Sequence, residues 1–433
     1  MLHSKEKITP RTILDKLVSE MDRPFVTVLI GPRQVGKTVL MRMIEERAPC
    51  KIVYLDIENP MDAVVLRDGL ETLLSEIGTE RQVLLLDEFH RIPDALSLFK
   101  QIRDGYPQIK VYASGSSSIE IHSHLKQSAV GRVRRTRIFP LSFPEWCHDR
   151  VQLDLSDWNP LEKLPPREAR RLDILLEEFI TWGGMPEPAN LTDEMERREA
   201  LHEICALYLE KDIRNLLKSE EMLKFNEFLR LMGIRLGQIM NRSEFSRQLG
   251  ISSRQVEKQL MVMEHTYVYC PVSTDYANPT KRLIKAPKIY WYDNGVRNAL
   301  VRDFRGRWQR PDGGVLLENH IFCELEKAAG IDTDILYHRT RDGQEIDFIL
   351  ERDRQKILVE VKSGLGRATV PNAIRDMLGR EDAMGAVVLN NQIQNCTEHN
   401  GKPVLFLPHT LAHTVPQLWD RLPHRGSDEI CNG

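Results

Sequence analysis

A glycine-rich loop between two regular segments constrains this chain more than any other feature of its sequence. The loop follows the apolar run at 25–30, precedes a segment with helical periodicity, and comprises Gly31, Pro32, Arg33, Gln34, Val35, Gly36, Lys37 and Thr38. In this pattern, G-x-x-x-x-G-K-[ST], backbone N–H groups face one point and the following helix N-terminus adds positive potential, which suits a phosphate. A strand, a phosphate-binding loop and a helix in that order predict an α/β fold.

Further apolar runs follow the loop, separated by stretches with helical periodicity. They lie at 51–56, 82–87, 110–114 and 136–139 and are rich in β-branched and other apolar residues. Near-continuous apolar strands that alternate with helices are typical of a parallel sheet covered on both faces. We therefore predict a parallel sheet of this kind for the first third of the chain.

Two carboxylates, Asp87 and Glu88, end the third apolar run. Beside a phosphate-binding loop, Asp87 is expected to complete the shell of a Mg²⁺ ion held by the Thr38 hydroxyl, while Lys37 reaches the β- and γ-phosphates. Glu88 is expected to polarise the attacking water. After the next run, the Ser116 hydroxyl is positioned to sense the γ-phosphate. Together these residues predict binding and hydrolysis of ATP with Mg²⁺.

Charge and composition exclude several classes of protein. The 433 residues contain 60 Lys and Arg against 63 Asp and Glu, a formal net charge of −3, so any DNA-binding surface must be local. No apolar run approaches the roughly 18 residues that span a bilayer, and the N-terminus lacks the apolar stretch of a signal peptide. We therefore expect a cytoplasmic protein with no membrane partner. The seven cysteines include no C-x-x-C pair, so no zinc site is expected.

Changes of pattern along the chain predict four domains. They are a P-loop core at 1–155, a helical lid at 156–232, a winged-helix domain at 233–309 and a separate α/β module at 310–433. Polar and proline-containing segments separate the first two, and a switch from helical to β-rich patterning marks the last.

The third domain carries a helix-turn-helix pattern. A short helical segment at 243–249 is followed by Gly250 and by a second helical segment, which begins with Ser252 and Gln255 at capping-box spacing. A pair of β-rich runs follows, in the order expected for a winged helix. The outer face of the second helix presents two cations that we expect to contact DNA, Arg254 and Lys258.

A basic cluster follows the expected sensor residue, with five basic residues and no acidic one in 125–140. At this point the chain resembles an AAA+ ATPase, in which polar sensor residues precede an arginine that reaches the ATP of the neighbouring subunit. The resemblance assigns this finger role to Arg132 and implies a homo-oligomer, which we expect to be a hexameric ring promoted by ATP. DNA contact and a solvated surface are the two other interpretations of the cluster.

An ordered set of motifs extends the resemblance along nearly the whole chain. The motifs lie at 31–38, 87–88, 115–117, 131–132, 140–145, 183–186, 208–212 and 317–319. Together they resemble the prokaryotic AAA ATPases that carry a C-terminal domain of unknown function, DUF4143. The resemblance implies the fold and the nucleotide chemistry and leaves the biological role open.

The last module brings acidic residues and a lysine together. Asp347 lies on one β-rich run, and alternation in the next run sends Glu360 and Lys362 to the same face beside it. Asp347 and Glu360 can hold Mg²⁺ against a phosphate while Lys362 orients the hydrolytic water, and Glu318 of the preceding helix can complete the cluster. The segment resembles the PD-(D/E)xK nuclease fold, with the Glu…Asp…Glu-x-Lys order of archaeal Holliday-junction resolvases. Whether such a site cleaves DNA or only binds it stays open.

Residues 281–310 form the most basic stretch of the chain, with nine basic residues against two acidic ones and aromatic residues between them. Such a stretch beside a winged helix is typical of a surface that follows phosphates. We expect it to contact DNA through Lys285, Lys288 and Arg307. A solvated wing packed by its aromatic residues is the alternative.

Two functions are compatible with these features. The leading hypothesis is an oligomeric, ATP-hydrolysing AAA+ protein that processes branched or damaged DNA by remodelling or branch migration, with possible metal-dependent cleavage. The alternative is a nucleotide-gated switch that binds a protein partner and carries an inactive nuclease-like module.

Overall fold

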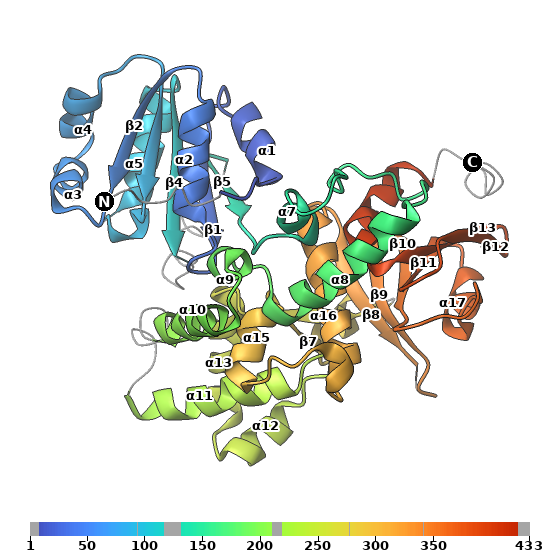
Figure 1. Cartoon of the computed structure of the whole chain (residues 1–433). Helices are drawn as coiled ribbons and strands as arrows, with labels where there is room; N and C mark the ends of the chain where they lie inside the picture. The colour runs from blue at the N-terminus through green and yellow to red at the C-terminus, as the bar shows by residue number, and fades with distance from the viewer. Residues whose placement is uncertain are drawn as a thin grey trace.

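The structure is a computed structural model that describes residues 8–92, 94–116, 131–209, 219–276, 278–340 and 342–422. Its N-terminal part and its C-terminal sheet lie on opposite sides of the molecule, with a group of helices beside and between them (Figure 1).

The N-terminal sheet has five strands in the order β2-β3-β4-β1-β5, and every neighbouring pair is parallel. This confirms the predicted α/β fold with a parallel sheet. The strands are β1 (Val26–Gly31), β2 (Lys51–Asp56), β3 (Gln82–Asp87), β4 (Ile109–Ser116) and β5 (Val133–Arg137).

Two apolar layers cover this sheet because consecutive strand residues point to opposite faces. Leu29 and Leu85 pack with α1 and α2 on one face, whereas Val28 and Leu84 pack with α3, α4 and α5 on the other. The helices are α1 (Ile13–Ser19), α2 (Lys37–Arg47), α3 (Pro60–Arg67), α4 (Leu70–Ile77) and α5 (Ala95–Gly105), and a short 3-10 turn spans Phe89–Arg91.

Helices dominate the middle of the chain. The two helices of the predicted helix-turn-helix are present, with Gly250 in the left-handed conformation (φ +63°) and a complete capping box between Ser252 and Gln255. The helices of this part are α7 (Phe143–Cys147), α8 (Pro166–Trp182), α9 (Pro186–Asn190), α10 (Glu194–Leu207), α11 (Ser219–Ile234), α12 (Arg242–Leu249), α13 (Ser253–His265) and α15 (Asn294–Val301).

The second sheet has eight strands in the order β12-β13-β11-β10-β9-β8-β6-β7. It includes the strand pair expected as a wing, since β6 pairs with β7 antiparallel and with β8 parallel. The strands are β6 (Tyr269–Thr274), β7 (Lys288–Trp291), β8 (Asp334–Arg339), β9 (Glu345–Arg352), β10 (Gln355–Val361), β11 (Ala383–Asn390), β12 (Asn395–His399) and β13 (Lys402–Pro408). The expected wing is therefore part of the C-terminal sheet, and a short helix, α14 (Pro279–Ile284), lies between its strands.

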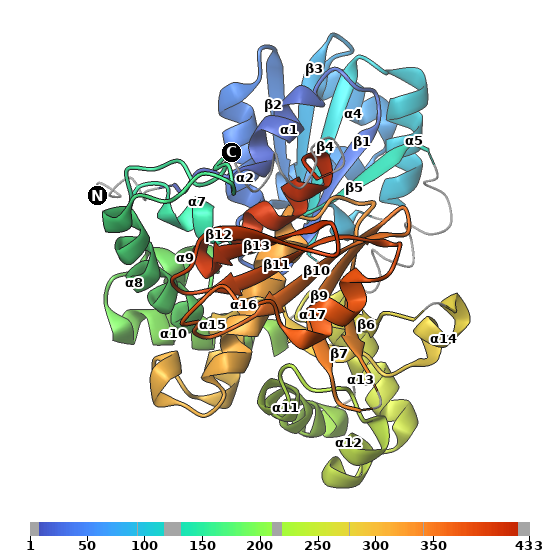
Figure 2. The ribbon, with the colours of Figure 1, turned by 90° about the vertical axis from the view of Figure 1, so that its right-hand side faces the viewer.

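Helix α16 (Gly313–Ala328) packs against this sheet, and α17 (Asn372–Leu378) lies between β10 and β11 in the chain (Figure 2). Strands β8, β9 and β10 form an antiparallel meander, after which β11 pairs with β10 in parallel. Two 3-10 segments, Arg307–Gln309 and His409–Asp420, flank the module.

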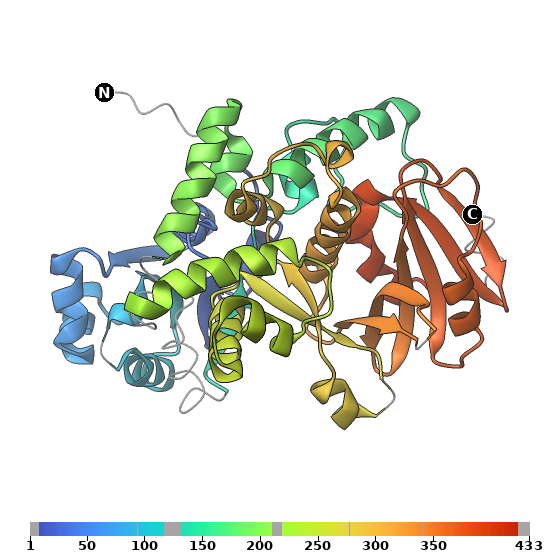
Figure 3. The ribbon, with the colours of Figure 1, turned by 90° about the horizontal axis from the view of Figure 1, so that it is seen from below.

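A single apolar cluster runs from Leu141 to Leu422 and includes residues of the helical middle part and of both faces of α16. The expected domain boundaries at 232 and 309 fall inside this cluster, so the segments they separate share one core. Seen from below, the helical part and the C-terminal sheet lie side by side (Figure 3).

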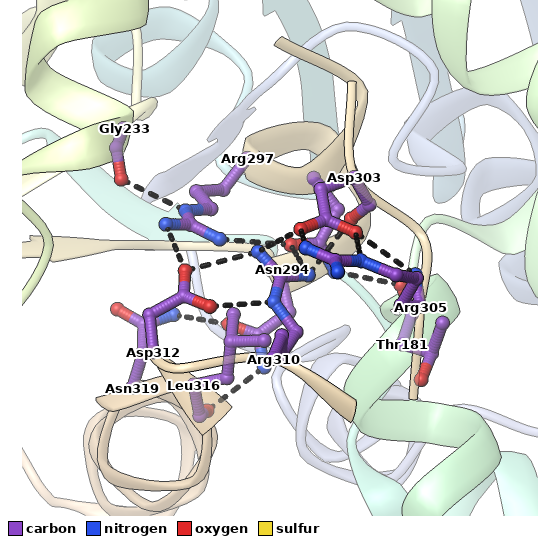
Figure 4. A network of polar contacts seen from close by, with 11 residues as sticks. Thr181, Gly233, Asn294, Arg297, Asp303, Arg305, Arg310, Asp312, Leu316 and Asn319 are labelled. Carbon is purple, nitrogen blue, oxygen red and sulfur yellow. Dashed lines mark hydrogen bonds and ion pairs between the residues drawn. The ribbon is translucent and has the colours of Figure 1, made fainter. Parts of the chain in front are cut away.

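Buried charges join the helices around α15 and α16 (Figure 4). The guanidinium of Arg297, 2% exposed, donates to the Gly233 carbonyl at 2.8 Å and pairs with Asp312 at 2.6 Å. Arg310 pairs with the same carboxylate at 2.6 Å. Arg297 and Arg310, which belong to the nine cations in 281–310, are therefore internal to the fold.

Candidate functional site

The phosphate-binding loop lies at the carboxyl edge of the N-terminal sheet, between β1 and α2. Gly36 precedes the helix with φ +90°, a conformation that side chains rarely adopt. At Gly31 an added Cβ would lie 2.2 Å from the Ile138 carbonyl oxygen. Both glycines are thus required by the local geometry of the predicted loop.

Lys37 begins α2 and turns back over the loop. Its ammonium donates to the carbonyls of Gly31 at 3.0 Å and Pro32 at 2.8 Å, and the side chain is 6% exposed. The ammonium is therefore held at the loop, where a phosphate bound to the N–H groups of the cradle would meet it.

The carboxylate of Asp87 connects four elements of the sheet edge. One oxygen accepts from the Thr38 hydroxyl at 2.7 Å and from the Tyr54 hydroxyl at 2.8 Å. The other accepts from the Ser114 hydroxyl and from the Glu88 N–H at 3.2 Å. Thr38 and Asp87 are thus adjacent, as their predicted role in holding Mg²⁺ requires.

Sequence patterns did not indicate Tyr54 and Ser114. The Tyr54 side chain reaches Asp87 because β2 pairs with β3 in parallel, in the register that places Asp56 opposite Asp87. Burial, followed by the hydrogen bond to Asp87, raises the pKa of Tyr54, so its hydroxyl stays a donor. Ser114 on β4 contacts Asp87, whereas the side chain of the predicted sensor Ser116 lies outside the described residues.

Glu88 follows β3 in the left-handed conformation (φ 56°), which aims its side chain away from the strand. His90 lies 3.1 Å from the Glu88 carboxylate. Burial of this carboxylate opposes ionisation, but the hydrogen bond and charge of His90, followed by Lys37 and Arg33, lower the pKa of Glu88 to about 2. Glu88 is therefore ionised and lies in the field of the loop cations. No sequence pattern pointed to His90.

Arg132 lies at the amino end of the strands, whereas the P-loop lies at their carboxyl end. Its carbonyl accepts from the N–H of Val26, the first residue of β1, at 2.9 Å. With about 3.3 Å per strand residue, it is about 17 Å from the loop that follows β1. Its guanidinium is half-buried and pairs with Asp104 at 3.1 Å. Arg132 is therefore too far away to contact a nucleotide in its own P-loop.

The predicted acidic cluster gathers on β9, β10 and α16. Val361 N–H donates to Asp347 at 2.8 Å, and Lys362 Nζ lies 2.5 Å from Glu360. Burial and then the negative charges of Glu318 and Glu360 raise the pKa of Asp347 well above its usual value. Burial also raises the pKa of Glu360, against the effect of Lys362. The four predicted residues thus lie close enough together for each charge to affect the pKa of its neighbours.

Lys288 belongs to this cluster and not to a DNA-binding surface. Its side chain is 3% exposed, and its ammonium pairs with Glu318 at 3.1 Å and with Glu345. The Tyr290 hydroxyl donates to Glu318 as well. The prediction that Lys288 contacts DNA is therefore corrected: as the first residue of a fully buried strand, β7, it points into the protein.

Arg307 requires the same correction. It is 5% exposed and its Nε donates to Glu177 on α8 at 2.6 Å, so it ties the C-terminal module to the helical part. The remaining predicted DNA contacts are more accessible. Arg254 and Lys285 are exposed, and Lys258, exposed too, pairs with Glu221 at 3.2 Å.

No group of three His, Cys, Asp or Glu side chains in the described ranges is arranged to hold a metal ion. The acidic cluster nevertheless offers an oxygen for one, because Glu360 Oε2 is buried without a hydrogen-bond partner. Four carboxylates (Glu318, Glu345, Asp347 and Glu360) surround the ammonium groups of Lys288 and Lys362, and the raised pKa values of Asp347 and Glu360 lower the negative charge that this group carries without a bound cation.

Comparison with protein families divides the chain into three matched regions. Residues 23–147 match the AAA domain, residues 174–306 match a domain of unknown function (DUF8612), and residues 313–409 match a domain of unknown function (DUF4143). The chain therefore contains an AAA-type P-loop ATPase-like domain and a DUF4143 domain, which confirms these two parts of the sequence-based resemblance.

Relatives that match most of this chain occur in bacteria and archaea. Uncharacterised proteins of Mycobacterium tuberculosis and Methanocaldococcus jannaschii are each 24% identical, over 86% and 89% of this chain and 76% and 84% of theirs. A Haemophilus influenzae protein is 22% identical over 93% of this chain and 98% of its own length.

Similar solved structures include a Walker-type ATPase of Pyrococcus abyssi, 15% identical, with a TM-score of 0.46 over 68% of this chain and 97% of that one. The RuvB Holliday junction branch migration motor of Thermotoga maritima is 16% identical, with a TM-score of 0.28 over 62% of this chain and 92% of that one. In the described part of the chain, none of the helices combines the length and apolar character needed to cross a membrane.

The P-loop site predicts different effects for its lysine and its glutamate. Lys37→Ala should abolish ATP turnover and weaken ATP binding, because the phosphates lose their cation. Glu88→Gln should lower kcat by about 10²–10⁴-fold while ATP stays bound, because only the carboxylate that polarises water is lost. Phosphate release and equilibrium binding of a fluorescent ATP analogue separate the two. Glu71→Gln, exposed on α4, is the matched control and should behave as the wild type. Near wild-type turnover in Glu88→Gln would contradict the assignment.

The His90 contact predicts a pH effect. Because the folded pKa of Glu88 lies below its ordinary value of 4.5, the stability from its ionisation is present above about pH 4.5 and is lost only as the pH falls toward 2. His90→Ala removes the hydrogen bond and the charge that lower the pKa of Glu88. The acid limb of the pH profile of kcat should therefore move to higher pH. Arg91→Ala, which breaks a pair with Glu58 instead, should leave the limb in place. Superimposable profiles for wild type and His90→Ala would rule out this role.

Proposed function

We propose that this protein is an oligomeric ATP hydrolase that uses its C-terminal half to bind and remodel branched or damaged DNA. The observation that carries the proposal is the Asp87 carboxylate, which joins the P-loop Thr38 to the strand end that presents an ionised Glu88. At the family level, the match of residues 23–147 to the AAA domain supports ATP hydrolysis.

The chain's own residues would perform four tasks in hydrolysis. The loop N–H groups and Lys37 bind the β- and γ-phosphates, while Thr38 and Asp87 hold the metal. Bound Mg²⁺ would supply positive charge to the phosphate oxygens. Glu88 accepts a hydrogen bond from the attacking water and orients it, and His90 keeps that carboxylate ionised and in place.

The position of Arg132 supports an assembly. Because this residue lies at the amino end of the strands, away from its own P-loop, a role in ATP hydrolysis would require the nucleotide of an adjacent subunit. Its partner Asp104 is on the surface, so the guanidinium exchanges one carboxylate for a phosphate when subunits meet. We propose a closed ring, with six subunits as the expected number.

Loss of Arg132 tests this assembly. Arg132→Ala should lower ATP turnover by about 10³-fold or more with little change in ATP affinity, because the finger stabilises transition-state charge. Arg103→Ala is the matched control, since Arg103 is half-buried like Arg132 and pairs with the same Asp104 at 2.8 Å. Light scattering at saturating ATP reports assembly. A fully active monomer, or equal losses in both variants, would contradict the finger role.

Three features support DNA as the partner of the C-terminal half. The order α16, β8, β9, β10, α17, β11, with an antiparallel meander followed by a parallel strand, is that expected for a PD-(D/E)xK-like module. The acidic cluster would hold a divalent cation through Asp347 and Glu360, and such an ion neutralises phosphate charge when bound. Arg254 is exposed in the first turn of the second helix-turn-helix helix.

A second candidate function is a nucleotide-gated switch that binds a protein partner. The position of Lys288 favours this function, because its ammonium pairs with Glu318 and Glu345, two of the carboxylates around the proposed metal site. In that case the cluster stabilises the fold and cleaves nothing.

Stimulation of ATP turnover by DNA separates the two functions. We expect single-stranded, duplex, forked or four-way DNA to raise the ATPase rate, and Arg254→Ala/Lys285→Ala to weaken binding and reduce the salt dependence by about one unit per lost contact. Arg67→Ala/Lys100→Ala, which removes two exposed cations of the N-terminal part, is the control. The absence of stimulation by any of these DNAs would favour the switch.

A further inference from the structure

A cleft of about 730 Å³ separates the N-terminal sheet from the C-terminal module. Its walls are α1 and β5 on one side and β6, β8 and the end of α16 on the other. Strand β5 is the last strand of the N-terminal sheet, and it lies on the side of that sheet that faces the C-terminal half (Figure 1). The volume lies in the range of about 300–1,000 Å³ typical of small-ligand sites.

Three of the cations that line the cleft already have partners. Arg137 pairs with Glu326 at 2.6 Å, Arg11 lies 3.4 Å from Glu145, and Lys327 donates to the Leu141 carbonyl at 2.8 Å. The Arg137 and Lys327 contacts join the two walls, and the Arg137 and Arg11 pairs neutralise two of the acidic residues in the cleft. They serve the structure and are not available to a ligand.

Two further cations in the lining, Lys16 on α1 and Arg135 on β5, are exposed, and neither has an acidic partner among the residues that the structure describes. The third acidic residue of the lining, Asp334, lies 3.7 Å from Arg282. The charge that remains uncompensated in the cleft is therefore positive, and it favours an anionic ligand.

The floor of the cleft is aromatic. Phe139 and Tyr267 line it, and both pack against Tyr292, with ring centroids 5.9 and 6.2 Å apart. The guanidinium of Arg137 lies 5.5 Å from the ring centres of Phe139 and Tyr267. Tyr267 is 6% exposed, so the Phe139 ring is the more accessible of the two, and an aromatic ring is a surface on which a nucleobase can stack. An acidic peptide would satisfy the two cations but would leave this aromatic floor without a matching group.

We infer that this cleft binds a phosphorylated nucleotide unit, either free or within a single strand, with Lys16 and Arg135 on its phosphate and the aromatic floor beneath its base. The cleft lies beside the P-loop, because Ile30 and Arg11 line it and Arg11 donates to the Val35 carbonyl at 3.1 Å, but the two proposed phosphate ligands belong to α1 and β5 and not to residues 31–38. Binding here would place a nucleic-acid strand or a second nucleotide between the ATPase core and the C-terminal module.

The test uses the full chain with Lys37→Ala, so that the P-loop no longer competes for nucleotide. Fluorescence anisotropy follows a labelled oligothymidylate and, separately, a fluorescent ATP analogue, over a range of NaCl concentrations. Adding Lys16→Glu/Arg135→Glu should weaken binding at least about tenfold and reduce the salt slope by about 1.4, at about 0.7 per phosphate contact on a single strand. Adding Arg67→Glu/Lys100→Glu, the matched pair of exposed cations outside the cleft, should leave both unchanged.

The outcomes are distinct. Binding of the oligonucleotide alone identifies a strand as the ligand, whereas equal binding of both probes identifies a free nucleotide. Unchanged affinity and salt slope in Lys16→Glu/Arg135→Glu, binding of neither probe, or displacement of the probe by polyglutamate at equal concentration would overturn the inference. Basal ATP turnover of Lys16→Glu/Arg135→Glu with an intact P-loop should match the wild type. If DNA does not stimulate ATP turnover, the proposed function is contradicted, whereas the inference that the cleft binds a nucleotide unit still depends only on the binding measurements.

Discussion

One buried amide, that of Asn319, fixes helix α16 against the second sheet. Its oxygen accepts the N–H of Trp291 at 2.8 Å, and its nitrogen donates to the carbonyl of the same residue at 3.1 Å and to Asn294 at 2.8 Å. The side chain is fully buried, so any other register of α16 on β7 would leave these groups without partners, at a cost of about 1–3 kcal/mol for each unsatisfied group. The ion network around Arg297 includes Asp312, the residue that precedes α16 (Figure 4).

From this fixed point α16 reaches both halves of the molecule. Glu318, adjacent to Asn319, enters the acidic cluster, whereas Glu326 pairs with Arg137 on β5 and Glu324 accepts the N–H of Phe143 on α7. With 16 residues at about 1.5 Å each, the helix extends about 24 Å. If β5 moves, either the Arg137–Glu326 pair breaks or α16 moves with the strand. In the second case Glu318 moves as well.

The parts of the fold that the sequence predicted well are those governed by local pattern. The bounds of β2 and β3 agree with their apolar runs; β3 is an interior, fully buried strand, and β2 keeps a nearly continuous apolar run although it lies at one edge of the sheet. Strand β5, expected at 136–139, spans Val133–Arg137, because an edge strand tolerates charged residues that obscure the pattern. The Thr38–Asp87 contact followed from motif order, whereas Tyr54, Ser114 and His90 depend on strand register and turn geometry, which a single sequence does not specify.

The basic stretch at 281–310 shows why charge along the chain is a poor guide to a binding surface. In the sequence, Lys288 and Arg307 cannot be told apart from Lys285 as cations. In the structure, both are buried and paired with carboxylates that distant elements contribute. Burying an ammonium or guanidinium costs several kcal/mol unless a paired charge compensates it, so each buried cation requires an acidic partner. Those partners, Glu318 and Glu177, lie outside the stretch, and a local count of charges omits them. The cations that remain available to a ligand are those that the fold leaves exposed and without an acidic partner in the described part of the chain, as Arg254 on α13 and Lys16 and Arg135 in the cleft are.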